Sequence, residues 1–250
     1  MLDLGVFVAM VLVGAMIFRM LLRAFLHRRA AAWTVAALAS FCLVSIVTYE
    51  ISRSTRFQMF GHMVLPRPTR EKVVALTFDD GPTSKYTPEI VETLRAHRVR
   101  ATFFLMGAEI ANAPEAARLI AAEGHEIGNH SWSHDRMVFK RESWIAEEIE
   151  RTDGAIRSSG YTGPILFRSP YGKRFVSLPW YLARHDRLNI FWDLAPDSAG
   201  VSTTAQLVEK VVTEAKPGSI VLLHLMYPQR EPSRRALPSI IDSEHARSAS

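Results

Sequence analysis

Thr77-Phe78-Asp79-Asp80-Gly81-Pro82 directly follows an apolar run at residues 73–76, and this stretch decides how the chain is interpreted. A short apolar run bounded by Gly and Pro predicts a buried strand that ends in a turn. The turn carries two adjacent carboxylates, Asp79 and Asp80, which could divide the work of a base and a metal ligand. An Asp-Asp-Gly-Pro sequence alone is more often just a turn, so its meaning depends on whether the rest of a metal site follows.

Strand-like and helix-like segments alternate along the chain after this stretch. Further short strands are expected at residues 101–106, 166–167, 189–192 and 220–223. One helix is expected to open at Pro88 with Thr87 as its N-cap, and others to cover residues 114–122, 142–159 and 203–215. This alternation predicts an α/β fold with a mainly parallel sheet, either an open wound sheet or a barrel.

Polar side chains follow the predicted strands at the points where the strands end. They are Asp79, Asp80, His130, His134, Arg168, Asp193, Asp197 and His224. In a parallel barrel the carboxyl ends of the strands open on one face, which is where such folds keep their catalytic groups. We therefore expect these side chains to converge on one pocket.

His130-Ser131-Trp132-Ser133-His134 spaces two imidazoles four residues apart. On a helical turn this spacing points both rings at one ion. The chain has nine histidines, so such a pair is weak evidence alone, and two surface histidines flanking Trp132 are the alternative. An aspartate from another strand would complete a site of two histidines and one carboxylate, which leaves open positions for a hydrolytic water.

Four segments resemble, in order and approximate spacing, the motifs of the polysaccharide deacetylases, which are carbohydrate esterase family 4 with the NodB homology domain. They are residues 77–82, 130–134, 168–172 and 222–224, and the resemblance covers residues 72–227. It implies an irregular (β/α) barrel that hydrolyses N-acetyl, or alternatively O-acetyl, groups of a carbohydrate. The implied cofactor is a divalent metal, usually Zn²⁺, with Co²⁺ or Ni²⁺ as alternatives. The substrate stays open between peptidoglycan, chitin-like or other acetylated glycans and a lipid-linked sugar.

The resemblance also implies catalytic roles. Asp79 is similar to the family's catalytic base, Arg168 to the residue that orients the base, and His224 to the general acid that protonates the departing amine. Without such an acid the amine would have to leave as an anion, which makes it a very poor leaving group.

The remaining site residues follow from the same resemblance. Asp80, His130 and His134 would be the metal ligands, and Leu222 would line the pocket for the acyl methyl group. The oxyanion of the tetrahedral intermediate needs an amide N–H. Proline has none, so we expect Tyr171, the residue after Pro170, to be the donor.

Two parts of the chain depart from the family's pattern. Where the family has two aspartates followed by tryptophan, this chain has Asp193-Leu194-Ala195-Pro196-Asp197-Ser198, and we expect Asp197 rather than Asp193 to tune His224. At the C-terminus no final strand is visible, so residues 231–250 are interpreted as a shortened segment that leaves a sheet edge exposed.

Two apolar runs, at residues 4–22 and 30–49, precede the domain, and the second is about long enough to cross a bilayer. Arginines between the runs favour a cytoplasmic loop, and the absence of a basic n-region argues against a cleaved signal peptide. We therefore expect a transmembrane helical hairpin in the cytoplasmic membrane, with a single span as the alternative. Residues 51–70 would be a linker and residues 71–230 a catalytic domain on the periplasmic or extracellular side.

Composition narrows the possible partners. The net charge of +5 is modest, and part of it belongs to the loop between the apolar runs. The remaining chain therefore lacks the strong positive charge that is typical of nucleic-acid-binding proteins. The single cysteine, Cys42, can form no intrachain disulfide. Two rival functions remain at this level: a catalytically inactive membrane-anchored carbohydrate-binding protein, and a non-haem iron oxygenase. The oxygenase would leave Arg168 and His224 unexplained.

Overall fold

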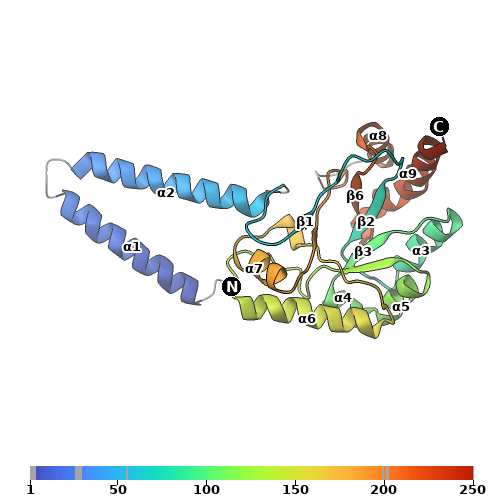
Figure 1. The fold of residues 1–250 in the computed structure, drawn as a ribbon, viewed down its shortest axis with the longest axis horizontal. Helices are drawn as coiled ribbons and strands as arrows, with labels where there is room; N and C mark the ends of the chain where they lie inside the picture. Colours follow the sequence, from blue (N-terminus) through green and yellow to red (C-terminus); the bar gives the residue numbers. More distant parts are fainter. Residues whose placement is uncertain (1–3, 26–29, 55, 199, 201–202, 250) are drawn as a thin grey trace.

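The computed structural model describes residues 4–25, 30–54, 56–198, 200 and 203–249. Two long helices, α1 (Leu4–Phe25) and α2 (Ala30–Arg53), project from an α/β domain and lie antiparallel to each other (Figure 1). Among the described residues one helical span, Trp33–Ser52, is long and apolar enough to cross a membrane, with a mean hydropathy of 1.8. In α1 the apolar stretch is the shorter Leu12–Leu22. The predicted two-span hairpin is therefore not supported, whereas one apolar helix that could serve as an anchor or a signal is present.

A four-stranded parallel sheet forms the centre of the domain, with the strand order β4-β3-β2-β6. The strands are β2 (Ala75–Asp79), β3 (Thr102–Leu105), β4 (Glu126–Asn129) and β6 (Ile220–His224). Because all four run in the same direction, their carboxyl ends meet at one edge of the sheet. The polar residues that follow β2, β4 and β6 are thereby brought to the same side of the domain.

Further parallel pairings extend the sheet on both sides. The short strands β1 (Met63–Val64) and β5 (Asn189–Ile190) pair with each other. Isolated bridges connect Asn129 to Phe167, Phe167 to Asn189, and Leu194 to Val221. The pairing thus passes from β4 through Phe167 to β5 and returns from Leu194 to β6, which is the order expected of an irregular barrel. The strand predicted at residues 166–167 contributes only bridges.

Helices cover the sheet, and most lie where the sequence places them. They are α3 (Thr87–Ala96), α4 (Gly107–Asn112), α5 (Pro114–Ala122), α6 (Glu142–Ser158), α7 (Ser177–Arg184), α8 (Thr204–Glu214) and α9 (Glu231–Ala249). Thr203 and Gln206 form a capping box at the start of α8, in keeping with the helix expected from residue 203. Thr87 is not an N-cap, because α3 already begins at Thr87 and Tyr86 occupies the cap position.

Side chains alternate across β2 and β6 as the pleat of a strand requires. Leu76 and Phe78 of β2 belong to the main hydrophobic core, together with side chains of α3 and α9. The intervening residues of β2 point to the opposite side, where Thr77 pairs with Leu222 and Asp79 pairs with His224. One face of these strands therefore supplies the core, and the other supplies the candidate site.

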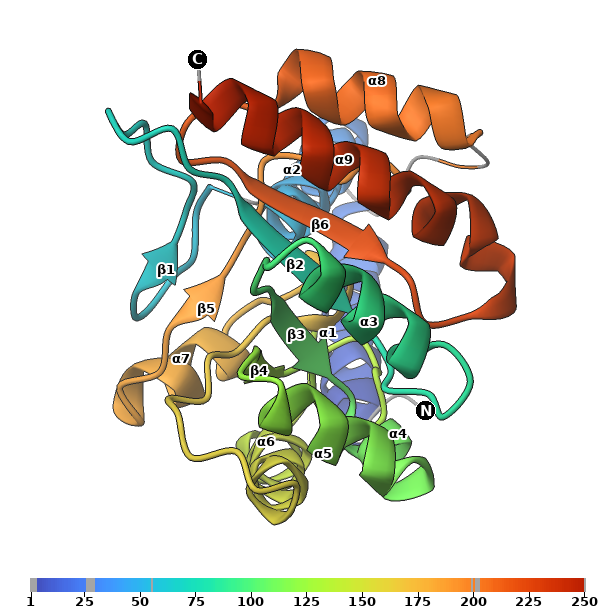
Figure 2. The same ribbon diagram turned by 90° about the vertical axis from the view of Figure 1, so that its right-hand side faces the viewer.

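The C-terminal segment differs from its prediction. Helix α9 continues to Ala249 and lies beside α8 (Figure 2). It buries Ala236, Leu237, Ile240 and Ile241 in the main core. Since α9 completes the core and Leu194 bridges to β6 at Val221, the predicted exposure of a sheet edge after His224 is wrong.

The predicted linker at residues 51–70 is also wrong over much of its length. Residues 63 and 64 form β1, which pairs with β5. The Phe60 ring packs edge-on against Trp180 of α7, with centroids 5.2 Å apart. The Arg174 side chain donates hydrogen bonds to the carbonyls of Ser54 and Phe57. The folded unit therefore begins near Ser52 and not at Glu71.

A stability difference between two truncated chains follows from this packing. A chain of residues 71–250 is expected to be at least about 2 kcal/mol less stable than one of residues 52–250, because a buried guanidinium loses its acceptors and the packing over β5 is removed. Urea unfolding followed by circular dichroism measures the difference. Both chains lack the apolar helix, so they differ only in the segment under test, and equal free energies of unfolding would contradict the prediction.

Candidate active site and metal centre

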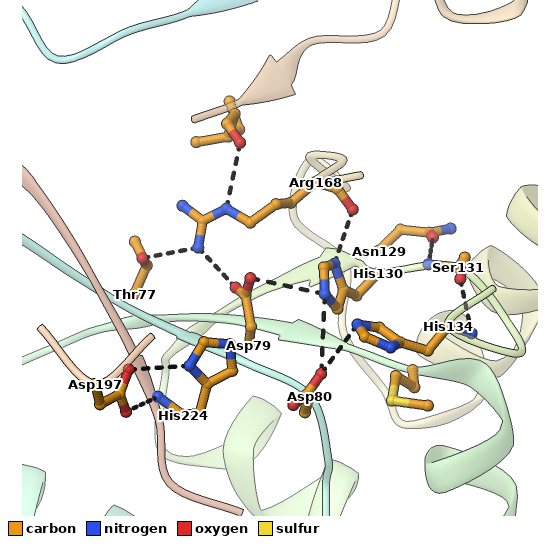
Figure 3. Close-up of polar contacts among 12 residues, drawn as sticks. Thr77, Asp79, Asp80, Asn129, His130, Ser131, His134, Arg168, Asp197 and His224 are labelled. Carbon is orange, nitrogen blue, oxygen red and sulfur yellow. Dashed lines mark hydrogen bonds and ion pairs between the residues drawn. The ribbon is translucent and has the colours of Figure 1, made fainter. Parts of the chain in front are cut away.

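Asp80, His130 and His134 come together beyond the carboxyl ends of β2 and β4 (Figure 3). One potential ligand atom of each lies within 4.8 Å of the others. The Nε2 atoms of His134 and His130 lie 3.3 and 3.9 Å from Asp80 Oδ1. These are the three residues that the sequence suggests as metal ligands, and the fold brings them into one cluster.

The chemistry of this cluster fits a divalent cation. Asp80 Oδ1 is buried without a hydrogen-bond partner among the described residues, a costly arrangement that a bound cation would relieve. His130 Nδ1 lies 2.8 Å from the carbonyl oxygen of Arg168. We assign the ring proton to Nδ1, which leaves the Nε2 lone pair facing the cluster, as metal-binding histidines commonly do. Two imidazoles and one carboxylate suit Zn²⁺ and similar ions.

The segment that carries the two histidines is a loop and not the predicted helical turn. Ser131 and His134 have positive φ angles of 65° and 60°. Glu148 of α6 holds the loop, because its Oε2 accepts hydrogen bonds from the N–H groups of Trp132 and Ser133 at 3.0 and 2.8 Å. The two imidazoles therefore converge through a loop that another helix holds in place, and Glu148 is a functional neighbour that the sequence did not reveal.

Asp79 forms a buried ion pair with Arg168. Arg168 Nη1 lies 2.6 Å from Asp79 Oδ1 and 2.9 Å from Thr77 Oγ1. Both charged side chains are buried. Burial by itself raises the pKa of Asp79, but the positive charge of Arg168 and its hydrogen bond hold that pKa below its ordinary value. The other carboxylate oxygen of Asp79 lies 3.6 Å from His130 Nε2, so it faces the metal cluster.

The Arg168 guanidinium is held between aromatic rings as well as by hydrogen bonds. Its Cζ lies 4.0 Å from the centroid of Phe104 and 5.3 Å from that of Trp192. The Phe104 ring occupies space next to Gly128, where a Cβ atom would approach the ring to 2.5 Å. A side chain at residue 128 would therefore displace the Phe104 ring against which the Arg168 guanidinium packs.

His224 is paired with Asp197. Its Nδ1 lies 3.0 Å from Asp197 Oδ1, and its backbone N–H donates to Asp197 Oδ2 at 2.7 Å. Asp193 lies elsewhere and accepts hydrogen bonds from Ser219 and Ile220. Burial by itself lowers the pKa of His224, but the hydrogen bond and charge of Asp197 raise it above its ordinary value. The structure thus brings Asp197, the preferred of the two aspartates, to His224.

Tyr171 lies in the short 3-10 turn Pro170–Gly172, and its φ of 57° is positive. Its ring is 4.6 Å from that of His134, so the turn borders the metal cluster. The N–H groups of Gly172 and Lys173 donate to carbonyls within the turn. They are therefore engaged, and the role of the Tyr171 N–H as oxyanion donor stays a prediction. Leu222 is buried on the same side of β6 as His224, where its role as a methyl-group contact stays a prediction.

Comparison with known proteins identifies the family. The model of the polysaccharide deacetylase family matches residues 66–187. The chitooligosaccharide deacetylase of Bradyrhizobium sp. is 36% identical over 159 residues, which is 63% of this chain and 73% of the relative. This chain belongs to the polysaccharide deacetylase family. The resemblance inferred from four motifs is confirmed, and the non-haem iron oxygenase is set aside.

Other relatives of this polysaccharide deacetylase act, by their names, on bacterial cell-wall glycans. A peptidoglycan-N-acetylglucosamine deacetylase of Bacillus cereus is 35% identical over 159 residues, but the chain spans only 57% of its length. A crystal structure of a peptidoglycan N-acetylglucosamine deacetylase superimposes with a TM-score of 0.69 at 30% identity, covering 74% of this chain and 86% of that one. The α/β fold with a parallel sheet is therefore that of carbohydrate esterase family 4.

Polysaccharide deacetylase folds also include a catalytically inactive example. A protein described as a family 4 pseudoenzyme from Bacillus anthracis superimposes with a TM-score of 0.64 at 25% identity, covering 72% of this chain and 65% of that one. The fold alone therefore does not establish catalysis. In this chain Asp79, the cluster at Asp80 and the pair of His224 with Asp197 lie together at one edge of the sheet, which favours catalysis.

Asp197→Asn is expected to move the alkaline limb of the pH–activity profile of this polysaccharide deacetylase to lower pH. If His224 is the general acid, it must be protonated to act, so activity falls as the pH rises through its pKa. Asp197 raises that pKa, and removing its charge lets His224 lose its proton at lower pH. Rates measured from pH 5 to 10 test this. An alkaline limb at the wild-type position would show that Asp197 does not tune His224.

Proposed function

We propose that this chain is a metal-dependent hydrolase that removes N-acetyl groups, or alternatively O-acetyl groups, from a carbohydrate at the outer face of the cytoplasmic membrane. The observation that carries the proposal is the cluster of Asp80, His130 and His134 beside an ion-paired Asp79. The apolar span Trp33–Ser52 supports a single membrane anchor that delivers the domain to the outer side.

Asp80, His130 and His134 would hold the divalent ion, for which Zn²⁺ is the first choice and Co²⁺ or Ni²⁺ are alternatives. When bound, such an ion polarises the acyl carbonyl and lowers the pKa of water from about 16 towards 7. The orphaned Asp80 Oδ1 and the Nδ1–H of His130, which donates to the Arg168 carbonyl, support this assignment.

The protein's own residues supply the proton transfers. Asp79, kept ionised and oriented by Arg168, accepts a proton from the water that attacks the acetyl carbonyl. The Tyr171 N–H would donate to the oxygen that becomes negatively charged. His224 would then give its Nε2 proton to the amine nitrogen as the carbon–nitrogen bond breaks, so acetate and a neutral amine are released.

The substrate class follows from the relatives together with the anchor. Two of the relatives are named for chitooligosaccharide and for the N-acetylglucosamine of peptidoglycan. A single apolar helix would keep the domain next to the membrane surface, within reach of the cell wall or of lipid-linked sugars. We therefore propose a glycan of the cell envelope that contains N-acetylglucosamine.

Acetate release is the decisive test of this function. The full chain, purified in detergent and loaded with Zn²⁺, is expected to release acetate from N-acetylglucosamine oligomers or peptidoglycan, with acetylated xylan as the O-acetyl comparison. A chelator should abolish the release, and added Zn²⁺, Co²⁺ or Ni²⁺ should restore it. Glycan binding without acetate release from any of these substrates would instead support the inactive carbohydrate-binding protein.

A further inference from the structure

Arg174 is a buried cation whose hydrogen-bond acceptors are three backbone carbonyls and, at 3.4 Å, the sulfur of Met63. Only 1% of its surface is exposed. Its Nη1 donates to the Gly172 carbonyl at 2.9 Å, whereas Nη2 donates to the carbonyls of Ser54 at 2.5 Å and Phe57 at 2.7 Å. Its backbone N–H donates to the Ser52 carbonyl at 3.0 Å. One side chain thus joins the turn at Gly172 to residues that lie 117 and 120 positions before Arg174 in the chain.

The first of these segments comprises the last two residues of the apolar helix α2, Ser52 and Arg53, together with residues 54, 56 and 57, and we call it the post-helix segment. A second contact connects it with the turn that holds Tyr171, because Lys173 Nζ lies 4.9 Å from the ring centroid of Tyr49 in α2. Two successive residues after the turn, Lys173 and Arg174, therefore contact the end of α2 and the segment that follows it. The Arg174 guanidinium also lies 4.0 Å from the ring centroid of Phe191, which fixes its plane.

The second segment is the turn itself. Tyr171 has a positive φ, a conformation that a residue with a side chain adopts only when its surroundings hold it there. The Gly172 carbonyl lies two peptide units after the Tyr171 N–H, in the same tight turn, and Arg174 Nη1 donates to it. The orientation of the Tyr171 N–H is therefore set in part by a side chain whose other hydrogen bonds go to the post-helix segment.

We propose that Arg174 is a positioning residue that couples the post-helix segment to the Tyr171 turn, so that full catalytic competence requires this segment to be docked. The proposal rests on the proposed role of Tyr171 in the reaction. It implies that the active site is held in a fixed orientation relative to the end of α2, rather than on a flexible tether. Burial lowers the pKa of Arg174 to about 10, so the side chain remains a cation at neutral pH.

The first test compares Arg174→Met, Arg174→Lys and a control, Arg184→Met, in the full chain loaded with Zn²⁺. Arg184 lies in α7 and makes one exposed ion pair at 3.4 Å. Arg174→Met is expected to lower kcat on N-acetylglucosamine oligomers by about 10–100-fold, because a catalytic donor displaced by about 1 Å loses much of its effect. KM and zinc content should stay within about twofold of wild type, as should every parameter of the control.

Arg174→Lys separates coupling from general stability. The single ammonium group of lysine cannot donate to the Gly172 carbonyl and to the carbonyls of the post-helix segment at the same time, as a guanidinium can. The kcat of Arg174→Lys should therefore lie between those of Arg174→Met and the wild type. Amide hydrogen exchange of Gly172 and Lys173 should be faster in Arg174→Met, whereas exchange of residues 130–134 should be unchanged. Wild-type kcat or wild-type exchange in Arg174→Met would overturn the proposal, and so would a uniform increase in exchange across the domain.

The second test breaks the coupling from the other side. An insertion of three glycines after Ser54 displaces the Phe57 carbonyl without changing any residue of the turn. Alone, the insertion should lower kcat about as much as Arg174→Met does. A chain with both changes should have the same kcat as a chain with either one. If the two reductions in kcat multiply when the changes are combined, the proposed coupling is overturned. Should Arg174→Met fail to fold, the insertion and Arg174→Lys carry the test. If the wild-type chain deacetylates no glycan, the proposed function fails, but exchange at residues 172–173 still reports the coupling.

Discussion

Asp79→Asn is expected to abolish turnover while the metal site remains loaded. Asparagine has the shape of aspartate but cannot accept the proton of the attacking water, and loss of a general base costs about 10²–10⁴-fold in rate. Asp79 is not a member of the cluster of Asp80, His130 and His134, so zinc content should remain at one ion per chain. Rates of acetate release and metal analysis on the same preparation check both parts of the prediction.

Two controls make this result interpretable. Asp79→Asn leaves the buried Arg168 without its carboxylate, so the variant must be shown to fold, for instance by its thermal unfolding midpoint. Asp193→Asn is the matched control, because Asp193 accepts hydrogen bonds from Ser219 and Ile220 at the other end of β6. This variant should turn over substrate at a rate near that of the wild type. Turnover by Asp79→Asn within tenfold of wild type would remove Asp79 as the base.

Much of the fold could be predicted because local signals agree with it. Pro114 marks the start of α5, and Thr203 with Gln206 marks the start of α8. The sequence did not predict two short helices, α4 and α7, which lack such signals. Helix α4 has six residues and begins at Gly107, a poor helix former, and α7 includes Pro179. Their positions depend on packing against α5 and α6, which no local pattern encodes.

The post-helix segment was misassigned for a different physical reason. It belongs to the predicted linker at residues 51–70, whose polar sequence with Pro66 and Pro68 is typical of a linker, but its contacts with Arg174 use backbone carbonyls, which every residue possesses. The hydrogen bonds that Ser54 and Phe57 accept come from Arg174, more than a hundred residues later in the chain. A composition argument cannot detect such contacts, because they depend on the tertiary position of one guanidinium.

The residues of the site could be named from the sequence more readily than their conformation. Parallel strands bring Asp79 of β2 next to His224 of β6, as the predicted alternation requires. The predicted helical geometry of the two histidines was wrong, because residues 131 and 134 have positive φ in a loop that Glu148 holds. Which aspartate reaches His224 was a choice that only the tertiary structure decides, since both lie in the same loop sequence.

His224→Gln is expected to lower the rate of N-deacetylation by about 10²–10⁴-fold and to spare the hydrolysis of an activated ester. Glutamine can donate a hydrogen bond from a similar position but has no proton to give to the departing amine. The amide substrate would then have to expel an amine anion. The leaving group of 4-nitrophenyl acetate is stable as an anion and needs no acid. Measuring both substrates on one preparation gives a ratio that does not depend on how much of the protein is active.

The leaving-group comparison distinguishes a general acid from a residue that merely shapes the pocket. If His224 only supports the loop through its bonds to Asp197, then His224→Gln should slow amide and ester hydrolysis by the same factor. If His224 is the acid, His224→Gln should slow only amide hydrolysis. Asp197→Asn should then also slow amide hydrolysis more than ester hydrolysis, but to a smaller extent, because His224 is less often protonated at neutral pH in that variant. Equal losses on the two substrates would assign protonation of the amine to another group and leave His224 with a structural role.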